Sequence, residues 1–226
     1  MKIPKILIVG ATGKLGSMIL NFTFKNNIPI FAITCFDNVK KLNSFKNKYD
    51  IKNTFCLNNK FDKEKFLFFC KSKRFDIIYF LDVGSSSLFY LSHFLKYQNN
   101  SDICIANKEM IIAGGSELRK SILVKGCNFI PLDSEHFSLI NHNFDSNNIK
   151  RIQITASGGP FYFDKKMNLN KVTKKQVLSH PKWKMGLNNL IDSSNFVNKV
   201  LEILELSYIY DIPLKKIDFV VSREAF

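Results

Sequence analysis

Short, continuous apolar runs alternate with longer stretches of helical spacing through the first half of the chain. Such runs are typical of strands buried on both faces of a parallel sheet. They lie at 6–9, 30–34, 76–81 and 103–106. The helical stretches between them lie at about 14–24, 39–48, 62–72 and 86–97. Strands that alternate with helices in this way predict an α/β domain with a doubly wound parallel sheet.

A glycine-rich loop directly follows the first apolar run. Residues Gly10 to Gly16 have the spacing G-x-x-G-x-x-G and precede a helical pattern. At such a helix start, backbone N–H groups and the helix dipole bind a pyrophosphate. The same residues also fit a glycine turn without a ligand. The first alternative makes residues 1–128 a Rossmann-like, dinucleotide-binding domain.

After about residue 128 the alternation lapses and polar motifs cluster. Asp133 and Glu135 are two residues apart, and in extended backbone that spacing points both side chains the same way. Two hard oxygen ligands suit Mg²⁺ or Mn²⁺, and Glu202 can supply a third carboxylate. The alternative is that Asp133 caps the helix that follows it. We assign residues 129–226 to a second domain, which binds metal and substrate.

Two further segments of this second domain are rich in polar residues. The glycines of Ser157-Gly158-Gly159-Pro160 allow a ligand's oxygens to approach the backbone, although a plain turn uses the same residues. Apolar residues recur at helical spacing between 193 and 208, with Glu202 and Glu205 on the opposite face. Taken alone, this polar stripe indicates a solvated helix face with an ion pair between Lys199 and Glu202.

Composition restricts the classes of function. The 226 residues include 33 Lys plus Arg against 19 Asp plus Glu, a net charge of +14 that attracts phosphorylated ligands. The lysines are spread along the chain, without the clustered Arg-rich motifs of nucleic-acid binding. No apolar run approaches the ~20 residues of a membrane span, and the first strand begins too early for a signal peptide. Five cysteines without a C-x-x-C pair are typical of buried, reduced thiols in a cytoplasmic protein.

Five motifs, in order, resemble the 1-deoxy-D-xylulose 5-phosphate reductoisomerase family of the non-mevalonate isoprenoid pathway. They are Ala-Asn-Lys-Glu at 106–109, Phe-Ile-Pro-Leu-Asp-Ser-Glu-His at 129–136, Ile-Thr-Ala-Ser-Gly-Gly-Pro-Phe at 154–161, His-Pro-Lys-Trp-Lys-Met-Gly at 180–186, and Asp192-Ser193-Ser194 with Asn198-Lys199 and Glu202. The resemblance implies a Rossmann-like sheet followed by an α+β catalytic domain. That domain is incomplete here, since residues 222–225 fall where the family has His-Pro-Gln-Ser and continues.

The resemblance also implies an activity and the residues that perform it. The family isomerises 1-deoxy-D-xylulose 5-phosphate and reduces the product with NADPH to 2-C-methyl-D-erythritol 4-phosphate, using Mn²⁺ or Mg²⁺. The implied metal ligands are Asp133, Glu135 and Glu202, and the implied catalytic residues are Lys108, Glu135 and His180. The implied substrate contacts are Lys108, Ser134, Glu135, Ser157, His180, Ser193, Asn198, Lys199 and Glu202. The implied NADPH contacts are Thr12, Gly13, Lys14, Leu15, Asn38, Asn107, Glu109 and Gly186.

The chain departs from the family at several of these positions. Lys14 replaces a serine, and Asp37 replaces a lysine. A carboxylate after the second strand is typical of NAD sites, so the sequence predicts weak discrimination between NADPH and NADH. The family is homodimeric, but most of its dimer-forming region has no counterpart here. We therefore expect an exposed strand edge at 217–221 and low or absent turnover by the isolated chain. A split subunit, or an inactive homologue that binds nucleotide or a partner protein, is the alternative to an active enzyme.

Overall fold

The computed structural model describes residues 3–140, 148–162, 168–179, 187–222 and 224. The chain divides into two compact units, Met1–Ile140 and Asn141–Phe226. The predicted boundary, between residues 128 and 129, falls inside the last strand of the first sheet, β6 (Asn128–Pro131). The first unit extends to Ile140 because that strand pairs with the sheet.

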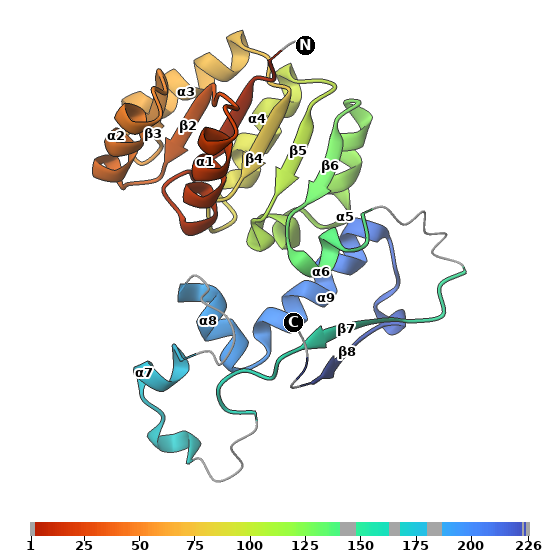
Figure 1. Ribbon diagram of the computed structural model, residues 1–226. Coiled ribbons are helices and arrows are strands. Elements are labelled where there is room, and N and C mark those ends of the chain that lie inside the picture. Colours follow the sequence, from red (N-terminus) through yellow and green to blue (C-terminus); the bar gives the residue numbers. More distant parts are fainter. Residues whose placement is uncertain (1–2, 141–147, 163–167, 180–186, 223, 225–226) are drawn as a thin grey trace. The chain divides into compact units, whose positions relative to one another are not determined.

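The first unit is built on a six-stranded sheet in which every pair of neighbours is parallel. The strand order is β3-β2-β1-β4-β5-β6, which is the Rossmann order. The strands are β1 (Ile6–Val9), β2 (Ala32–Cys35), β3 (Asn53–Cys56), β4 (Ile77–Phe80), β5 (Asp102–Ile105) and β6 (Asn128–Pro131). The helices are α1 (Lys14–Lys25), α2 (Val39–Lys48), α3 (Lys60–Ser72), α4 (Ser87–Tyr97), α5 (Lys108–Val124) and α6 (Ser134–Phe137). Figure 1 shows helices on both faces of this sheet, with α1 in front of the strands and α4 behind them.

The doubly wound fold confirms the prediction from the alternating pattern, with two strands added, β3 and β6. The apolar run at 6–9 forms β1, whose four residues are all buried. Strand β3 was not predicted, since only Thr54 and Phe55 in it favour a strand and three of its four residues are partly exposed. Behind the central strands, Phe66 and Phe80 each pack edge-on against Phe94, with ring centroids 5.9 Å apart.

The carboxyl ends of the six parallel strands share one edge of the sheet, and polar segments follow them there. Gly10 follows β1, Asp37 follows β2 and Asp82 follows β4. Lys108 and Asp133 follow β5 and β6. The strand order reverses between β1 and β4, and in open α/β sheets this switch point is where ligands bind.

The second unit combines helices with a two-stranded parallel sheet. Its strands are β7 (Ile152–Ala156) and β8 (Ile217–Val221), and its helices are α7 (Lys174–Val177), α8 (Leu187–Ser194), α9 (Val197–Tyr210) and the 3-10 turns η1 (Leu169–Lys171) and η2 (Leu214–Lys216). The helix predicted over 193–208 is wrong in one respect. It is interrupted at Phe196, whose φ of 66° is left-handed, so α8 ends at Ser194 and α9 begins at Val197.

All five cysteines are free and buried. Cys35 and Cys56 are register partners on β2 and β3. Burial, followed by the neighbouring Cys56, raises the pKa of the Cys35 thiol to about 12, and burial raises that of Cys104 to about 12. Among helices in the described ranges, none has both the length and the apolar character needed to cross a bilayer.

Candidate functional site

The glycine-rich loop after β1 fits a dinucleotide pyrophosphate. Gly10 has a φ of +83°, and an added Cβ would lie 2.5 Å from the backbone nitrogen of Asp82. An added Cβ at Gly16 would lie 2.6 Å from the Cα of Ala11, so the start of α1 lies directly on the loop. Gly13 is the N-cap of α1 and has no side chain that would cover the first-turn N–H groups. These groups and the helix dipole form an anion site.

Strand β2 and helix α2 hold this loop in place. The Ala11 N–H donates to the Thr34 carbonyl at 2.8 Å. Lys41, in the first turn of α2, donates from Nζ to the Thr12 carbonyl at 2.7 Å. Its backbone N–H donates to Oδ1 of Asn38, the N-cap of α2, at 3.0 Å. Lys41 thus joins two of the predicted cofactor-binding segments. The sequence prediction missed it, and the Lys40-Lys41 pair directly after Asn38 was the available signal.

Asn107 connects the ends of β4 and β5. Its Oδ1 accepts from the Met110 N–H at 2.9 Å, so it caps α5 as the sequence indicated. Its Nδ2 donates to the Gly84 carbonyl at 2.9 Å and to Oδ1 of Asp82 at 3.4 Å. The Ser87 hydroxyl donates to the other Asp82 oxygen. A carboxylate that sequence reasoning did not select therefore lies at the switch point, beside Gly10.

Burial raises the pKa of the Asp82 carboxyl above its ordinary value, against the lowering effect of hydrogen bonds from Ser87 and Asn107. The folded protein then keeps this proton to a higher pH than the unfolded chain does. The free energy of unfolding should therefore fall as the pH rises from 3.8 to the raised pKa. Relative to wild type, the Asp82→Asn variant should become more stable across that window, as urea titrations at several pH values would measure.

Asp218 provides a control, because the expected pH dependence of its contribution to stability has the opposite sign. The hydrogen bond from Arg151 lowers the pKa of Asp218 below 3.8. The stabilisation that the ionised Asp218 provides is therefore lost as the pH falls through that lowered pKa. Relative to wild type, Asp218→Asn should become less stable as the pH rises. An Asp82→Asn difference that does not change with pH would contradict the raised pKa of Asp82.

Lys108 and Asp133 meet at the ends of β5 and β6. Lys108 Nζ lies 3.3 Å from Oδ2 of Asp133, with 6% and 18% of the two side chains exposed. Asp133 occupies the N-cap position of α6, but its side chain does not cap this helix, whose four residues are all described. Glu135 lies within α6, so the extended backbone assumed for the 133–135 spacing is wrong. The Ser134 hydroxyl donates to Oε2 of Glu135 at 2.7 Å.

In the second unit, α9 carries a buried polar cluster. Lys199 Nζ lies 2.5 Å from Oε2 of Glu202 and donates to the Thr155 carbonyl of β7 at 2.7 Å. Asn198 Nδ2 donates to the other Glu202 oxygen at 2.5 Å. The solvated polar face predicted for this helix is wrong, because Glu202 is only 3% exposed whereas Val200 is 51% exposed. Pairing lets these charges be buried, a possibility that an apolar pattern does not reveal.

The Ser157–Pro160 turn packs on the end of α8. Gly159 has a φ of +67°, and an added Cβ would lie 2.4 Å from the Ser193 carbonyl oxygen. The sequence predicted that a ligand's oxygens would approach the backbone at these glycines. At Gly159 the group that approaches the backbone is instead the Ser193 carbonyl of the protein itself. This contact brings together two segments that carry predicted substrate contacts, Ser157 and Ser193.

Five other predicted residues, and the metal ligands taken as a set, are placed as follows. His180 and Gly186 lie outside the described residues. Lys14, Leu15 and Glu109 lie in the first turns of α1 and α5, at the carboxyl edge of the sheet. Of the implied metal ligands, Asp133 and Glu135 belong to the first unit and Glu202 to the second, so their joint coordination of one ion stays a prediction.

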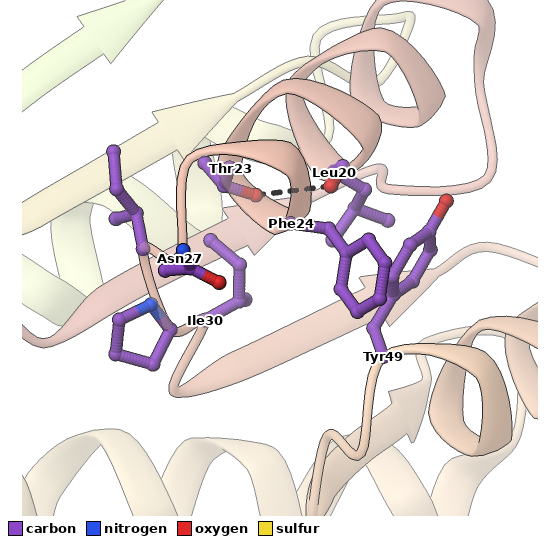
Figure 2. Close-up of a pocket in the computed structure, with 8 residues that line it drawn as sticks. Leu20, Thr23, Phe24, Asn27, Ile30 and Tyr49 are labelled. Atoms are coloured by element: carbon purple, nitrogen blue, oxygen red, sulfur yellow. Dashed lines mark hydrogen bonds between the residues drawn. The ribbon is translucent and has the colours of Figure 1, made fainter.

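A separate cavity of about 240 Å³ lies where α1 leads into β2. Figure 2 shows Phe24 and Tyr49 along one side of it and the Thr23 hydroxyl, which donates to the Leu20 carbonyl at 3.1 Å. The lining residues are Leu20, Thr23, Phe24, Asn27, Ile28, Pro29, Ile30 and Tyr49. This cavity lies at the amino end of β2, away from the glycine loop, and contains no predicted site residue.

Comparisons with known proteins identify relatives of the chain in sequence and in fold. The family model of the 1-deoxy-D-xylulose 5-phosphate reductoisomerase C-terminal domain matches residues 129–210. The reductoisomerase of Campylobacter jejuni (strain RM1221) is 34% identical over 96% of this chain and 61% of its own length. That of Thermoanaerobacter pseudethanolicus is 32% identical over 98% and 62%. The chain thus spans about three-fifths of these relatives.

Solved structures agree on the fold. The 1-deoxy-D-xylulose 5-phosphate reductoisomerase from Zymomonas mobilis, in complex with NADPH, matches with a TM-score of 0.81 at 24% identity, over 99% of this chain and 62% of that one. A reductoisomerase in complex with NADPH, fosmidomycin and magnesium matches with a TM-score of 0.79 at 24% identity, over 97% and 61%. In sequence and in fold, the chain is a relative of the 1-deoxy-D-xylulose 5-phosphate reductoisomerase family.

Proposed function

We propose that the chain binds NADPH and a divalent metal ion, and that it takes part in the isomerisation and reduction of 1-deoxy-D-xylulose 5-phosphate to 2-C-methyl-D-erythritol 4-phosphate. The observation that carries this proposal is the Lys108–Asp133 pair, 3.3 Å apart, at the same sheet edge as the glycine loop. A dinucleotide that crosses the switch point from the loop after β1 extends toward β4 and β5. A substrate held near Lys108 would then lie within reach of the nicotinamide.

The chain's own residues suit these ligands. Thr12, Gly13, Lys14 and Leu15 would contact the pyrophosphate from the loop and the first turn of α1, and Asn38, Asn107, Glu109 and Gly186 would complete the cofactor contacts. Asp133, Glu135 and Glu202 offer the hard carboxylate oxygens that Mg²⁺ and Mn²⁺ prefer. A bound ion would act as a Lewis acid toward the substrate's oxygens.

Substrate recognition is assigned to residues around this metal set. Lys108, with Ser134 and His180, would hold the sugar part, and Lys108 would also balance the charge of Asp133. The phosphate and hydroxyl groups would be bound by Ser157, Ser193, Asn198 and Lys199, whose lysine and short donors form charge-assisted hydrogen bonds. In the second unit this assignment is supported by the buried Asn198–Lys199–Glu202 cluster on α9.

The cellular location and the association of the chain belong to the same proposal. Five free, buried cysteines support a cytoplasmic location. The family resemblance supports association with a second copy of the chain or with a partner subunit. Light scattering on the purified protein measures that association directly.

Oxidation of NADPH by the purified chain tests the activity. Turnover by the isolated chain is expected to be low, and to occur only when 1-deoxy-D-xylulose 5-phosphate and Mn²⁺ or Mg²⁺ are both present, because the carboxylates and Lys108 act on the substrate together with the ion. Loss of turnover on chelation, and its return on adding Mn²⁺, would support the proposal. NADPH binding without turnover under any metal condition would favour a non-catalytic nucleotide-binding homologue instead.

A further inference from the structure

Lys41 crosses from the first turn of α2 to the glycine loop. Its ammonium lies 2.7 Å from the Thr12 carbonyl and 5.4 Å from the centre of the Phe45 ring, and the residue is partly buried. The carbonyl and the ring restrain a side chain that would otherwise be mobile. The ammonium is thus fixed between the segments that follow β1 and β2.

In a dinucleotide-binding sheet, the adenosine ribose lies between these two segments. A carboxylate after the second strand binds the ribose 2′-hydroxyl in NAD sites, whereas a nearby cation accommodates the 2′-phosphate in NADP sites. Here Asp37 supplies the carboxylate. Its charge repels a 2′-phosphate, so a chain that uses NADPH needs a cation close by.

We propose that Lys41 is this cation and that it gives the site a preference for NADPH over NADH, in place of the weak discrimination that Asp37 alone predicts. The inference rests on the proposed function only in requiring a dinucleotide at the glycine loop. An ammonium has three N–H donors, and in the described part of the chain the Thr12 carbonyl takes one of them. Two donors remain for phosphate oxygens, and the restrained side chain loses little entropy on binding.

Two other lysines are competitors for this role. Lys40 is the exposed neighbour of Lys41 on α2, and Lys14 lies in the first turn of α1. Lys41 differs from Lys40 in being tied to the loop itself. It differs from Lys14 in belonging to the helix that follows Asp37, on the ribose side of the loop.

The test compares the affinities of the full chain for NADPH and NADH by titration calorimetry, with adenosine 2′,5′-bisphosphate and ADP as smaller probes. Lys41→Gln is expected to weaken binding of NADPH and of the bisphosphate about 10- to 100-fold, the effect of losing a charge-assisted hydrogen bond. NADH and ADP should change less than about 3-fold. Lys41→Arg should keep the preference, and Lys40→Gln and Lys48→Gln are charge-matched controls on the same helix.

Each other outcome overturns the inference in a distinct way. Equal losses for NADPH and NADH would mean that Lys41 only positions the loop. A preference that survives Lys41→Gln but disappears in Lys40→Gln or Lys14→Gln would assign the role to that lysine. If wild type binds neither dinucleotide while thermal unfolding shows a folded protein, the proposed nucleotide function fails as well, whereas binding of both with equal affinity removes this inference alone.

Discussion

The Glu202→Gln variant is expected to lose more than about 100-fold in turnover and in Mn²⁺ affinity, because losing even an outer partner of a metal ligand costs 10- to 100-fold. Glutamine keeps the shape of the side chain and an acceptor for Lys199, but it removes the charge that a hard divalent ion requires. Calorimetric titration with Mn²⁺ and NADPH oxidation measure the two effects. The control is Glu117→Gln, whose glutamate side chain is 78% exposed on α5.

Lys199→Met separates the metal role of Glu202 from its ion pair. This variant keeps the three carboxylates and removes the cation from a pair of which only 8% and 4% of the side chains are exposed. It should lower the free energy of unfolding by about 3 kcal/mol, because it leaves a buried charge without its partner. It should still bind Mn²⁺. If Glu202→Gln destabilises the protein similarly but binds Mn²⁺ like wild type, Glu202 is only the partner of Lys199.

Gly10→Ala is expected to abolish dinucleotide binding and to destabilise the first unit by about 1–3 kcal/mol more than Gly84→Ala does. The two glycines have almost the same φ, +83° and +85°, so a left-handed alanine costs both variants a similar amount. Only at Gly10 would the new Cβ meet backbone, 2.5 Å from the Asp82 nitrogen. At Gly84 it meets no described atom within 4 Å.

Urea unfolding measures the stability difference, and titration with NADPH measures binding. The loop and the backbone of Asp82, which follows β4, must separate to admit the methyl group, and this displaces the loop. Equal stability of the two variants, or NADPH binding by Gly10→Ala with unchanged affinity, would show that the loop adjusts without cost.

The first unit was largely predictable because strands such as β1 and β2 are buried on both faces. A run of four apolar residues without interruption, as in β1, is typical of a buried strand in an α/β chain. The edge strand β3 was not predicted, because residues 53–56 combine one asparagine with only two strong strand formers. Gly10, directly after β1, was also predictable. Its φ is +83° and its Cα lies close to the backbone of Asp82, and only glycine fits such a position.

The second unit shows where pattern reasoning fails. The spacing of apolar residues placed Glu202 on the solvent-exposed face of the helix, but its carboxylate is buried with Lys199 and Asn198. Such a cluster depends on side chains meeting in space, as does the contact of Lys41 with the loop. The left-handed Phe196 is a third case. Apolar spacing through 193–208 continues across it, so nothing in that pattern marks the break between α8 and α9.

The distribution of cysteine gives the first unit its own reporter of unfolding. All five buried thiols lie between Cys35 and Cys127, in the first unit, and the second unit has no cysteine. A reagent that reacts with thiols therefore detects opening of the six-stranded sheet, whereas circular dichroism follows the helices of both units. Recording both in one denaturant series shows whether the units unfold in one cooperative step or separately, without any label being introduced.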